Sequence, residues 1–581
     1  MARLKLVFVS LFTVGTLFGS VSALLFTVAL IGRAPLPVLV LIILFTIAAS
    51  LFGWAFGPWF TDLIQSWVYH VEKLSLPELQ ARHPKVAAFL EETCKKNGIP
   101  VPMIRIVQDD NPTAYTYGSI PRNARIVVSR GLFRFLDTQE VNAVVAHELG
   151  HIKHYDFVVM TLATTLLQVL YEVFWVFSRM RSRGRNNPGP LIALVAWVLW
   201  FIGTYLVLWL SRTREYLADA FSAEQLGDPA PLQRALVKIA YGMAEVQLTA
   251  GVQSQRLLQA TRAMGISDPK AAPSLGNAVR ALQGGPQEGN LALKQAPVEA
   301  PEWGALGGDV AYSDGAGTSS FDPSQIEPIF LFDLFNPWAT VSELSSTHPL
   351  TGKRIQALND QARELKKTPL FSLARVDRLG EQLSSARLYG KFFLEVVIYF
   401  LPWILPLPAL LLLIFLPKAV GLVPMAIGVG MLVKGLYRYA GTAPFEKTTM
   451  YELMCDPYAS PLRGRPVELE GEIIGKAAAG STVGEDLTMK DRSGGLVMLN
   501  YEHWFPLLGN FFFGFGKAGR LFGQSGTATG WFRRSVFQFV DLHELKVGGD
   551  TIGSYTRFWG VSLGFVMIGV GFLVGAAALV A

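Results

Sequence analysis

Cysteine is scarce in this chain. Only two cysteines, Cys94 and Cys455, occur among 581 residues, and both fall in polar segments. This scarcity argues against a disulfide framework and against a metal site built from cysteine thiolates. Charged residues are also sparse, at 17%, whereas hydrophobic residues reach 51% and the mean hydropathy is +0.34. The composition excludes a soluble enzyme with an ordinary surface-to-volume ratio and predicts a membrane protein.

Long apolar runs divide the sequence. A run of about 20 residues crosses a bilayer, and about seven runs qualify: Leu6–Gly32, Pro35–Trp59, Phe157–Phe177, Leu191–Leu210, Val397–Leu416, Ala419–Leu436 and Phe558–Ala581. The first run is longer than the apolar region of a cleavable signal, about 7 to 15 residues, which predicts a retained anchor. Lysine and arginine beside the spans account for the net charge of +6, so we expect no nucleic-acid binding.

Two polar segments carry strand patterns. Between the second and third spans, β-rich runs at Met103–Val107, Ala114–Gly118 and Ala124–Ser129 are separated by turn residues, which predicts a small antiparallel sheet. Tyr437–Arg557 alternates strand-like runs with glycine turns, which predicts a β-barrel or sandwich.

A predicted helix carries a metal-binding pattern. In "AHELGH", His147 and His151 are four residues apart and therefore share one helix face, with Glu148 beside them. Two neutral imidazoles can hold zinc, which lowers the pKa of a bound water, and the glutamate can take its proton. The pattern predicts one zinc ion per chain; the alternative is a helix face with chance histidines.

A catalytic zinc needs a third protein ligand, and two glutamates compete for the role. Glu172 lies several turns inside the third span. Glu215 follows the fourth span as closely as His151 precedes the third, and a hairpin of two spans returns the chain to the same side of the membrane. We therefore predict that Glu215 is the ligand.

Asp219 lies one helical turn after Glu215. Its carboxylate is predicted to hydrogen-bond the outer nitrogen of a ligating histidine. The alternative for Glu215 and Asp219 is a charged juxtamembrane helix in which Arg212 and Arg214 form salt bridges.

Four sequence signatures occur in an order typical of one family. They are "AHELGH", a hydrophobic hairpin, "SRTREYLADA" and "STHPLTGKRI", within about Ala34–Leu379. This order resembles the HtpX-type and CAAX prenyl protease family of integral-membrane zinc metalloendopeptidases. The resemblance implies a zinc metalloendopeptidase of the gluzincin type, with His147, His151 and Glu215 as zinc ligands and Glu148 as the general base.

The resemblance also implies active-site roles for His348 and Arg354 in the "THPLTGKRI" stretch. His348 could donate a hydrogen bond to the oxyanion of a tetrahedral intermediate. The alternative is a histidine that caps the helix beginning near Gly352.

A strand facing the catalytic helix is expected to bind substrate. Relatives often show Asn-Ala-Phe or Asn-Ala-Tyr there, where this chain has Thr113-Ala114-Tyr115, so a function of that Asn side chain does not carry over. The backbone edge of Ala114, Tyr115, Thr116, Tyr117 and Gly118 can pair with an extended peptide without any particular side chain.

The predicted function is hydrolysis of peptide bonds in membrane or membrane-associated proteins, and the resemblance implies a role in protein quality control. A CAAX-type processing protease is the less favoured alternative, because that branch carries more spans ahead of its motif. A non-enzymatic membrane scaffold is a second alternative, against which the intact Glu148 argues. The expected location is the bacterial inner membrane. Arg3 and Lys5 before the first span, with the Lys and Arg of Phe60–Asp156, favour a site facing the cytoplasm, although the arginines of "SRMRSRGRNNPG" disagree.

The predicted fold class is an α+β polytopic membrane protein: a mostly helical zinc metallopeptidase core with a small antiparallel sheet, about seven transmembrane helices and a C-terminal β-rich barrel or sandwich. The expected partners are a polypeptide substrate, the lipid bilayer and a partner protein at the β-rich domain. The predicted divisions are two transmembrane helices (1–59), the metallopeptidase core (60–250) with its transmembrane hairpin (157–210), a flexible linker (251–327), completion of the core with the THP motif (328–390), a transmembrane pair (391–436), the β-rich accessory domain (437–557) and a final transmembrane helix (558–581).

Overall fold

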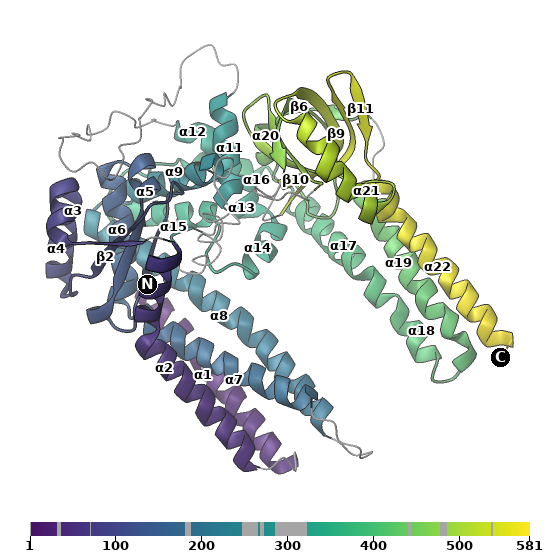
Figure 1. Cartoon of the computed structure of the whole chain (residues 1–581), viewed down its shortest axis with the longest axis horizontal. Coiled ribbons are helices and arrows are strands. Elements are labelled where there is room, and N and C mark those ends of the chain that lie inside the picture. The colour runs from purple at the N-terminus through teal and green to yellow at the C-terminus, as the bar shows by residue number, and fades with distance from the viewer. Residues whose placement is uncertain are drawn as a thin grey trace.

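The computed structural model describes residues 2–31, 36–69, 71–179, 188–246, 265–267, 272–284, 322–439, 444–476, 485–535 and 538–580. Two bundles of apolar helices extend from the same side of a polar part that contains both sheets (Figure 1). Among the described residues, 6 helices are long and apolar enough to cross a membrane, and α1 (Ala2–Ile31) adds a shorter apolar stretch at Phe8–Leu24. These helices correspond to the predicted spans.

The first bundle joins four helices: α1, α2 (Leu36–Val68), α7 (Asp156–Arg179) and α8 (Gly189–Leu226). α7 packs against α8, and α1 packs against both. α8 is one continuous helix of 38 residues, which at 1.5 Å per residue measures roughly 57 Å. Its apolar first part is long enough for the bilayer, so its polar C-terminal turns continue beyond the bundle.

The first sheet has the strand order β1-β2-β4-β3, built from β1 (Glu72–Leu74), β2 (Met103–Val107), β3 (Ala114–Tyr117) and β4 (Arg125–Ser129). β1 pairs with β2 and β3 pairs with β4 in antiparallel fashion, but β2 and β4 are parallel. A purely antiparallel sheet is therefore wrong: two chain reversals separate β2 from β4, so they run in the same direction. β3 is left at the edge of the sheet.

The helix α6 (Thr138–Lys153) lies against β3 and α8. A capping box begins this helix, since the Glu140 backbone N–H donates to Asp137 at 2.9 Å and the Asp137 N–H donates to Glu140 at 3.0 Å. Both faces of α6 are buried, and α4 (Pro84–Asn97) also packs on it. The helix that carries the histidines is therefore fixed by neighbours on several sides.

Helix α11 (Ala272–Gly284) corrects part of the predicted linker. It packs on α9 (Ala230–Val246) and on α20 (Met450–Met454), inside the range 251–327. A Cβ at Gly276 would lie 1.9 Å from the Ala240 carbonyl oxygen, so this glycine allows a close helix contact. Gly276 thus serves packing of α11 on α9. Most of the remaining linker lies outside the described residues.

Short helices complete the polar part. The chain after the THP motif forms two helices, α15 (Thr351–Glu364) and α16 (Leu373–Glu381). The others are α3 (Leu76–Arg82), α5 (Arg130–Phe135), α12 (Pro323–Ile326), α13 (Phe330–Phe335) and α14 (Pro337–Leu344).

The second bundle contains α17 (Ser385–Ile404), α18 (Pro406–Leu412), α19 (Leu422–Arg438) and α22 (Thr556–Val580). α17 and α18 together form one candidate span despite their prolines. α19 and α22 meet through glycines, because a Cβ at Gly428 would lie 2.7 Å from the Gly564 carbonyl oxygen. Close approach at small residues is a common way to pack helices in membranes.

The C-terminal β-rich domain is a barrel. Its strands are β6 (Arg465–Lys476), β7 (Leu487–Asp491), β8 (Leu496–Asn500), β9 (Ser525–Arg534) and β10 (Gln538–Val547). They pair in a closed circuit, β6-β7-β8-β10-β9 and back to β6. β5 (Glu446–Lys447) and β11 (Asp550–Gly553) extend it at its margins. The circuit decides between the barrel and the sandwich that the sequence left open.

Candidate metal centre

Three side chains converge between α6 and α8. The Nε2 atoms of His147 and His151 lie 3.2 Å apart. Glu215 approaches both, with Oε2 at 3.5 Å from His147 Nε2 and Oε1 at 3.7 Å from His151 Nε2. All three residues are buried, and one ligand atom from each lies within 4.8 Å of the others. Two nitrogens and one carboxylate oxygen in this arrangement can hold a metal ion.

A glycine allows α6 and α8 to meet at this point. Gly150 lies between the two histidines in the chain, and a Cβ there would be 3.0 Å from the Ala218 Cα. Ser222, one turn further along α8, donates a 2.7 Å hydrogen bond to the Ala143 carbonyl of α6. The sequence of α6 therefore supplies both the imidazoles and the close approach that brings Glu215 to them.

The outer nitrogens of both histidines face carboxylates. His147 Nδ1 lies 2.9 Å from Asp219 Oδ1, and His151 Nδ1 lies 2.6 Å from Asp156 Oδ2. A carboxylate beside each Nδ1 favours a proton on that atom, so Nε2 is the nitrogen that can bind a metal ion on the side where the two imidazoles converge.

Each of these carboxylates is paired with an arginine. Arg354 donates from Nε and Nη2 to Asp219 at 2.9 and 2.6 Å. Arg214 Nε lies 2.9 Å from Asp156 Oδ1. Buried charges are costly unless they are paired and hydrogen-bonded, so these pairs keep Asp219 and Asp156 ionised beside the histidines.

The protonation of His147 reflects this environment. Burial alone would lower the pKa of its imidazole, but hydrogen bonds to Asp219 and Glu215 outweigh burial and raise the pKa to about 9. The carboxylates of Asp219 and Glu215 thus favour a positively charged imidazole. A bound cation would supply positive charge at the same place.

Glu148 lies beside the convergence point and is fully buried. Burial raises the pKa of its carboxyl group, while the two histidines and a hydrogen bond from Thr116 act in the opposite direction. Thr116 Oγ1 of β3 donates to Glu148 Oε2 at 2.5 Å, whereas Oε1 is buried with no hydrogen-bond partner among the described residues. One oxygen is thereby oriented and the other remains able to accept a proton.

The loop before α15 adds His348. Its Nε2 lies 3.7 Å from Glu215 Oε1, and its Nδ1 lies 2.9 Å from Thr347 Oγ1. Arg212, on α8, holds this loop through hydrogen bonds to the Glu343 and Ser346 carbonyls at 2.9 and 2.8 Å. His348 is thus buried at the same centre as the three converging side chains.

The edge of β3 is partly paired within the chain. Tyr115 forms an isolated antiparallel bridge with Gly265, and the Ile266 N–H donates to the Ala114 carbonyl at 3.1 Å. Arg354 also donates to the Ile266 carbonyl. This internal contact covers the Ala114–Tyr115 end of the predicted substrate strand. The Tyr117–Gly118 end is therefore the part of this edge that a substrate could pair with.

The structure thus brings together His147, Glu148, His151, Glu215, Asp219, His348 and Arg354. Glu172 is elsewhere on α7, where it accepts a 2.6 Å hydrogen bond from Gln168. Arg212 and Arg214, which the alternative assigned to surface salt bridges, instead hold the His348 loop and Asp156.

Sequence reasoning missed two contacts of this site. Neither the helix period nor the count of spans singles out Asp156, and its only sequence signal is an acid five residues after His151 at the start of an apolar helix. The hydroxyl of Thr116 was also missed, because the strand was considered for its backbone alone.

Comparisons with known proteins identify the family of this chain. The model of Peptidase family M48 matches residues 80–362. A protease HtpX homolog of Methanothermobacter thermautotrophicus is 35% identical over 204 residues, which cover 33% of this chain and 77% of the relative. A protease HtpX homolog of Thermoplasma acidophilum is 35% identical over 234 residues, covering 40% of this chain and 71% of the relative. The solved structure of S. mikatae Ste24p overlaps 41% of this chain and 59% of its own, with 22% identity and a TM-score of 0.28.

The chain belongs to peptidase family M48. It is a membrane-embedded metalloprotease with several apolar helices long enough to cross the bilayer. The family predicted from the four sequence signatures is therefore confirmed.

We expect Asp156→Ala to weaken metal binding by about 10 to 100-fold, because the carboxylate that orients His151 is lost. Equilibrium dialysis at fixed free metal, followed by elemental analysis, measures the effect. Asp360→Ala is the matched control, since Asp360 pairs with Arg363 on an exposed face of α15. Equal metal affinity in the two variants would show that Asp156 does not support the site.

Proposed function

We propose that this chain is a zinc-dependent endopeptidase of the HExxH-plus-glutamate type, with His147, His151 and Glu215 as the zinc ligands. The convergence of the three side chains carries the proposal. Ligand atoms about 2.1 Å from a tetrahedral zinc ion lie about 3.4 Å from one another. The three observed separations of 3.2, 3.5 and 3.7 Å fit that value, and two imidazoles with one carboxylate are a donor set that zinc accepts.

When bound, zinc supplies a Lewis acid that polarises a carbonyl and lowers the pKa of a water. Glu148 accepts the proton of the attacking water and passes it to the leaving amine. Its orientation comes from Thr116, and its burial favours the protonated form that must deliver the proton. His348 donates to the oxyanion, a role that neither ligating imidazole can fill.

Asp219 and Arg354 act through His147 in this proposal. Arg354 fixes both oxygens of Asp219, and Asp219 fixes the ring of His147. The substrate lies extended at the Tyr117–Gly118 end of the β3 edge, beyond the part that Gly265 and Ile266 cover, and its main-chain hydrogen bonds are independent of side-chain identity.

The substrates are membrane or membrane-associated polypeptides, as in protein quality control. The supporting observation is that the site lies at the end of a helix, α8, whose first part is an apolar span. A CAAX-type processing protease remains the alternative within the same family. We further propose a bacterial inner membrane location with the site facing the cytoplasm, supported by Arg3 and Lys5 at the start of α1.

We propose that the chain is divided into the segments predicted from the sequence, except that α11 belongs to the folded core. We also propose that the C-terminal barrel has an accessory role in contact with lipid or a partner protein. Large apolar side chains of α21 (Pro506–Phe512) and its surroundings are exposed beside the start of α22, among them Phe505, Leu508 and Phe512. Trp504 joins this face to α22 by packing against Phe558 at 4.7 Å between ring centroids. Exposed aromatics next to the end of a span favour the membrane interface.

Replacing Glu148 with Gln should leave the metal in place and reduce hydrolysis by at least about 10²-fold, because the ligands are intact and the base is absent. Casein degradation by detergent-purified protein, with and without a zinc chelator, gives the rate, and elemental analysis gives the metal content. A variant as active as the parent would eliminate Glu148 as the base.

Glu215→Ala should remove most of the metal and all activity, whereas Glu172→Ala should retain both. The two glutamates are matched controls for each other, since both lie on helices of the same membrane hairpin. Loss of metal from Glu172→Ala with retention in Glu215→Ala would place the site inside the bilayer and refute the ligand assignment.

A spin label at Leu508→Cys should show contact with lipid in nanodiscs, because α21 is assigned to the interface. The matched label at Thr551→Cys, on the exposed strand β11, should contact water. Oxygen and a water-soluble relaxation agent distinguish the two environments. A label at position 508 that is as accessible to the aqueous agent as the label at position 551 would contradict the assignment.

A further inference from the structure

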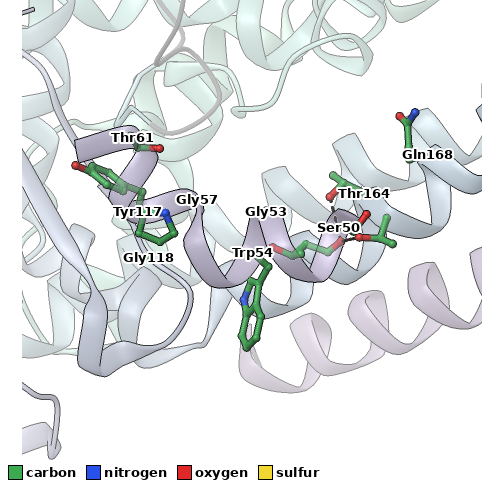
Figure 2. Close-up of a pocket in the computed structure, with 12 residues that line it drawn as sticks. Ser50, Gly53, Trp54, Gly57, Thr61, Tyr117, Gly118, Thr164 and Gln168 are labelled. Carbon is green, nitrogen blue, oxygen red and sulfur yellow. Dashed lines mark hydrogen bonds between the residues drawn. The ribbon is translucent and has the colours of Figure 1, made fainter. Parts of the chain in front are cut away.

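A cavity of about 450 Å³ lies between α2 and α7, at the level of their apolar segments (Figure 2). Ser50, Gly53, Gly57 and Thr61 of α2 line one side. Because these residues are spaced by three or four, they share one face of the helix. From Ser50 to Thr61 the face extends about 16 Å along the helix axis.

The glycines of this face have open space above them. A Cβ built at Gly53 or Gly57 meets no atom within 4 Å. Some other glycines of the apolar helices serve internal packing, as at Gly203 and Gly564, where the nearest atom would be 2.7 Å away, whereas Gly15 and Gly19 of α1 are also open. Two glycines four residues apart allow a second helix to approach closely, and within the described structure no helix occupies that position at Gly53 and Gly57.

The opposite wall is polar for a membrane helix. Thr164 and Thr165 of α7 line the cavity, and their hydroxyls donate 2.7 Å hydrogen bonds to the Met160 and Thr161 carbonyls. Each hydroxyl oxygen can still accept a hydrogen bond. Gln168 adds an amide at the far end of the same wall. Such groups can satisfy backbone N–H groups of a helix that begins to unwind within the bilayer, where an unsatisfied group is costly.

One end of the cavity reaches the catalytic sheet. Tyr117 and Gly118, at the end of β3, belong to its lining. Figure 2 shows them beside Thr61 and Gly57, at the opposite end from Gln168. Thr116, the preceding residue, donates to Glu148. A chain that leaves the cavity at this end therefore meets the unshielded end of the β3 edge.

A proline in α2 joins the cavity wall to the strand. Pro58 cannot donate to the carbonyl of Trp54 four residues before it. The hydroxyl of Ser119 donates to that carbonyl at 2.5 Å, and Trp54 Nε1 donates to the Ser119 carbonyl at 3.1 Å. These two hydrogen bonds fix the α2 wall of the cavity relative to the turn that follows β3.

We propose that this cavity binds a transmembrane segment of a membrane-protein substrate, whose end unwinds and extends along β3 toward Glu148. The proposal deepens the proposed protease function and rests on it. The occupant is a polypeptide because acyl chains gain nothing from hydroxyl and amide groups, whereas helices associate through small residues and interhelical hydrogen bonds. Because the cavity continues to the edge of β3, we infer that its occupant is a substrate and not an unrelated membrane protein.

Photo-crosslinking tests the occupant. A photo-reactive phenylalanine analogue replaces Ser50 in the full-length Glu148→Gln protein, reconstituted in liposomes with a single-span reporter that has a cytoplasmic tail. The matched control carries the analogue at Gly15 of α1, another position with nothing within 4 Å. We expect adducts with the apolar segment of the reporter from position 50 and none from position 15. Adducts with lipid alone, or equal adducts from both positions, would overturn the proposal.

Cleavage rates test whether the cavity is needed to cleave a membrane substrate. Leucine at both Gly53 and Gly57 fills the face without an internal clash, and leucine at Gly15 and Gly19 of α1 is the matched control because both of those sites are also open. We expect the ratio of reporter cleavage to casein cleavage to fall about tenfold in the first variant and to stay at the parental value in the second. An unchanged ratio in the first variant would contradict the proposal. A parent that cleaves neither substrate would instead refute the protease function, while the crosslinks would still report on the cavity.

Discussion

The contact of α6 with α8 at Gly150 is the constraint on which the metal centre depends. The two helices are separated in sequence by the first helix of a membrane hairpin, and they meet where a Cβ built at Gly150 would lie 3.0 Å from the Ala218 Cα. A side chain at Gly150 would push α8 away and carry Glu215 and Asp219 with it. His147 would then lose both of its carboxylate contacts, at 3.5 Å from Glu215 and 2.9 Å from Asp219. The distance between two helix backbones therefore sets the distance between the metal-binding atoms.

The charged side chains around this contact pair with one another. Asp219 pairs with Arg354, and Asp156 pairs with Arg214, so each carboxylate beside a histidine has a cation on its other side. Isolated buried charges would be expensive, and removing one partner of such a pair costs about 3–5 kcal/mol. Arg354 comes from α15 and Arg214 from α8, so the ion pairs also join elements that are far apart in the chain. The arrangement stabilises the ring orientations of both histidines in the apo protein.

Much of the site could be predicted from the sequence because its residues belong to helices with regular spacing. His147 and His151 share a face by period alone, and Glu215 was selected by counting spans of a hairpin. Asp156 could not be found in this way, because its contact with His151 follows a turn at Tyr155, which has a positive φ of 56°. Local patterns do not predict the direction in which the chain leaves such a turn.

The same limit applies to the sheets and the linker. The parallel pairing of β2 with β4 depends on which edge of β4 the hairpin leaves open, and alternation within a strand carries no such information. Helix α11 lies inside the range predicted as a linker, and its packing depends on the contact of Gly276 with the Ala240 backbone, which local composition does not reveal. The closure of the barrel through β8 and β10 is likewise a pairing between strands distant in sequence.

Helix α7 connects the metal centre with the membrane. Its first residue, Asp156, fixes His151, and Thr164 and Gln168, two and three turns later, line the cavity beside α2. A tilt of α7 that widened the cavity would therefore also shift the carboxylate that orients a metal-binding histidine. Since α7 packs along α8, the same motion would act on the helix that carries Glu215. In the proposed function, α7 therefore lines the cavity for a membrane segment and orients one metal ligand, and α8, which packs against it, supplies another.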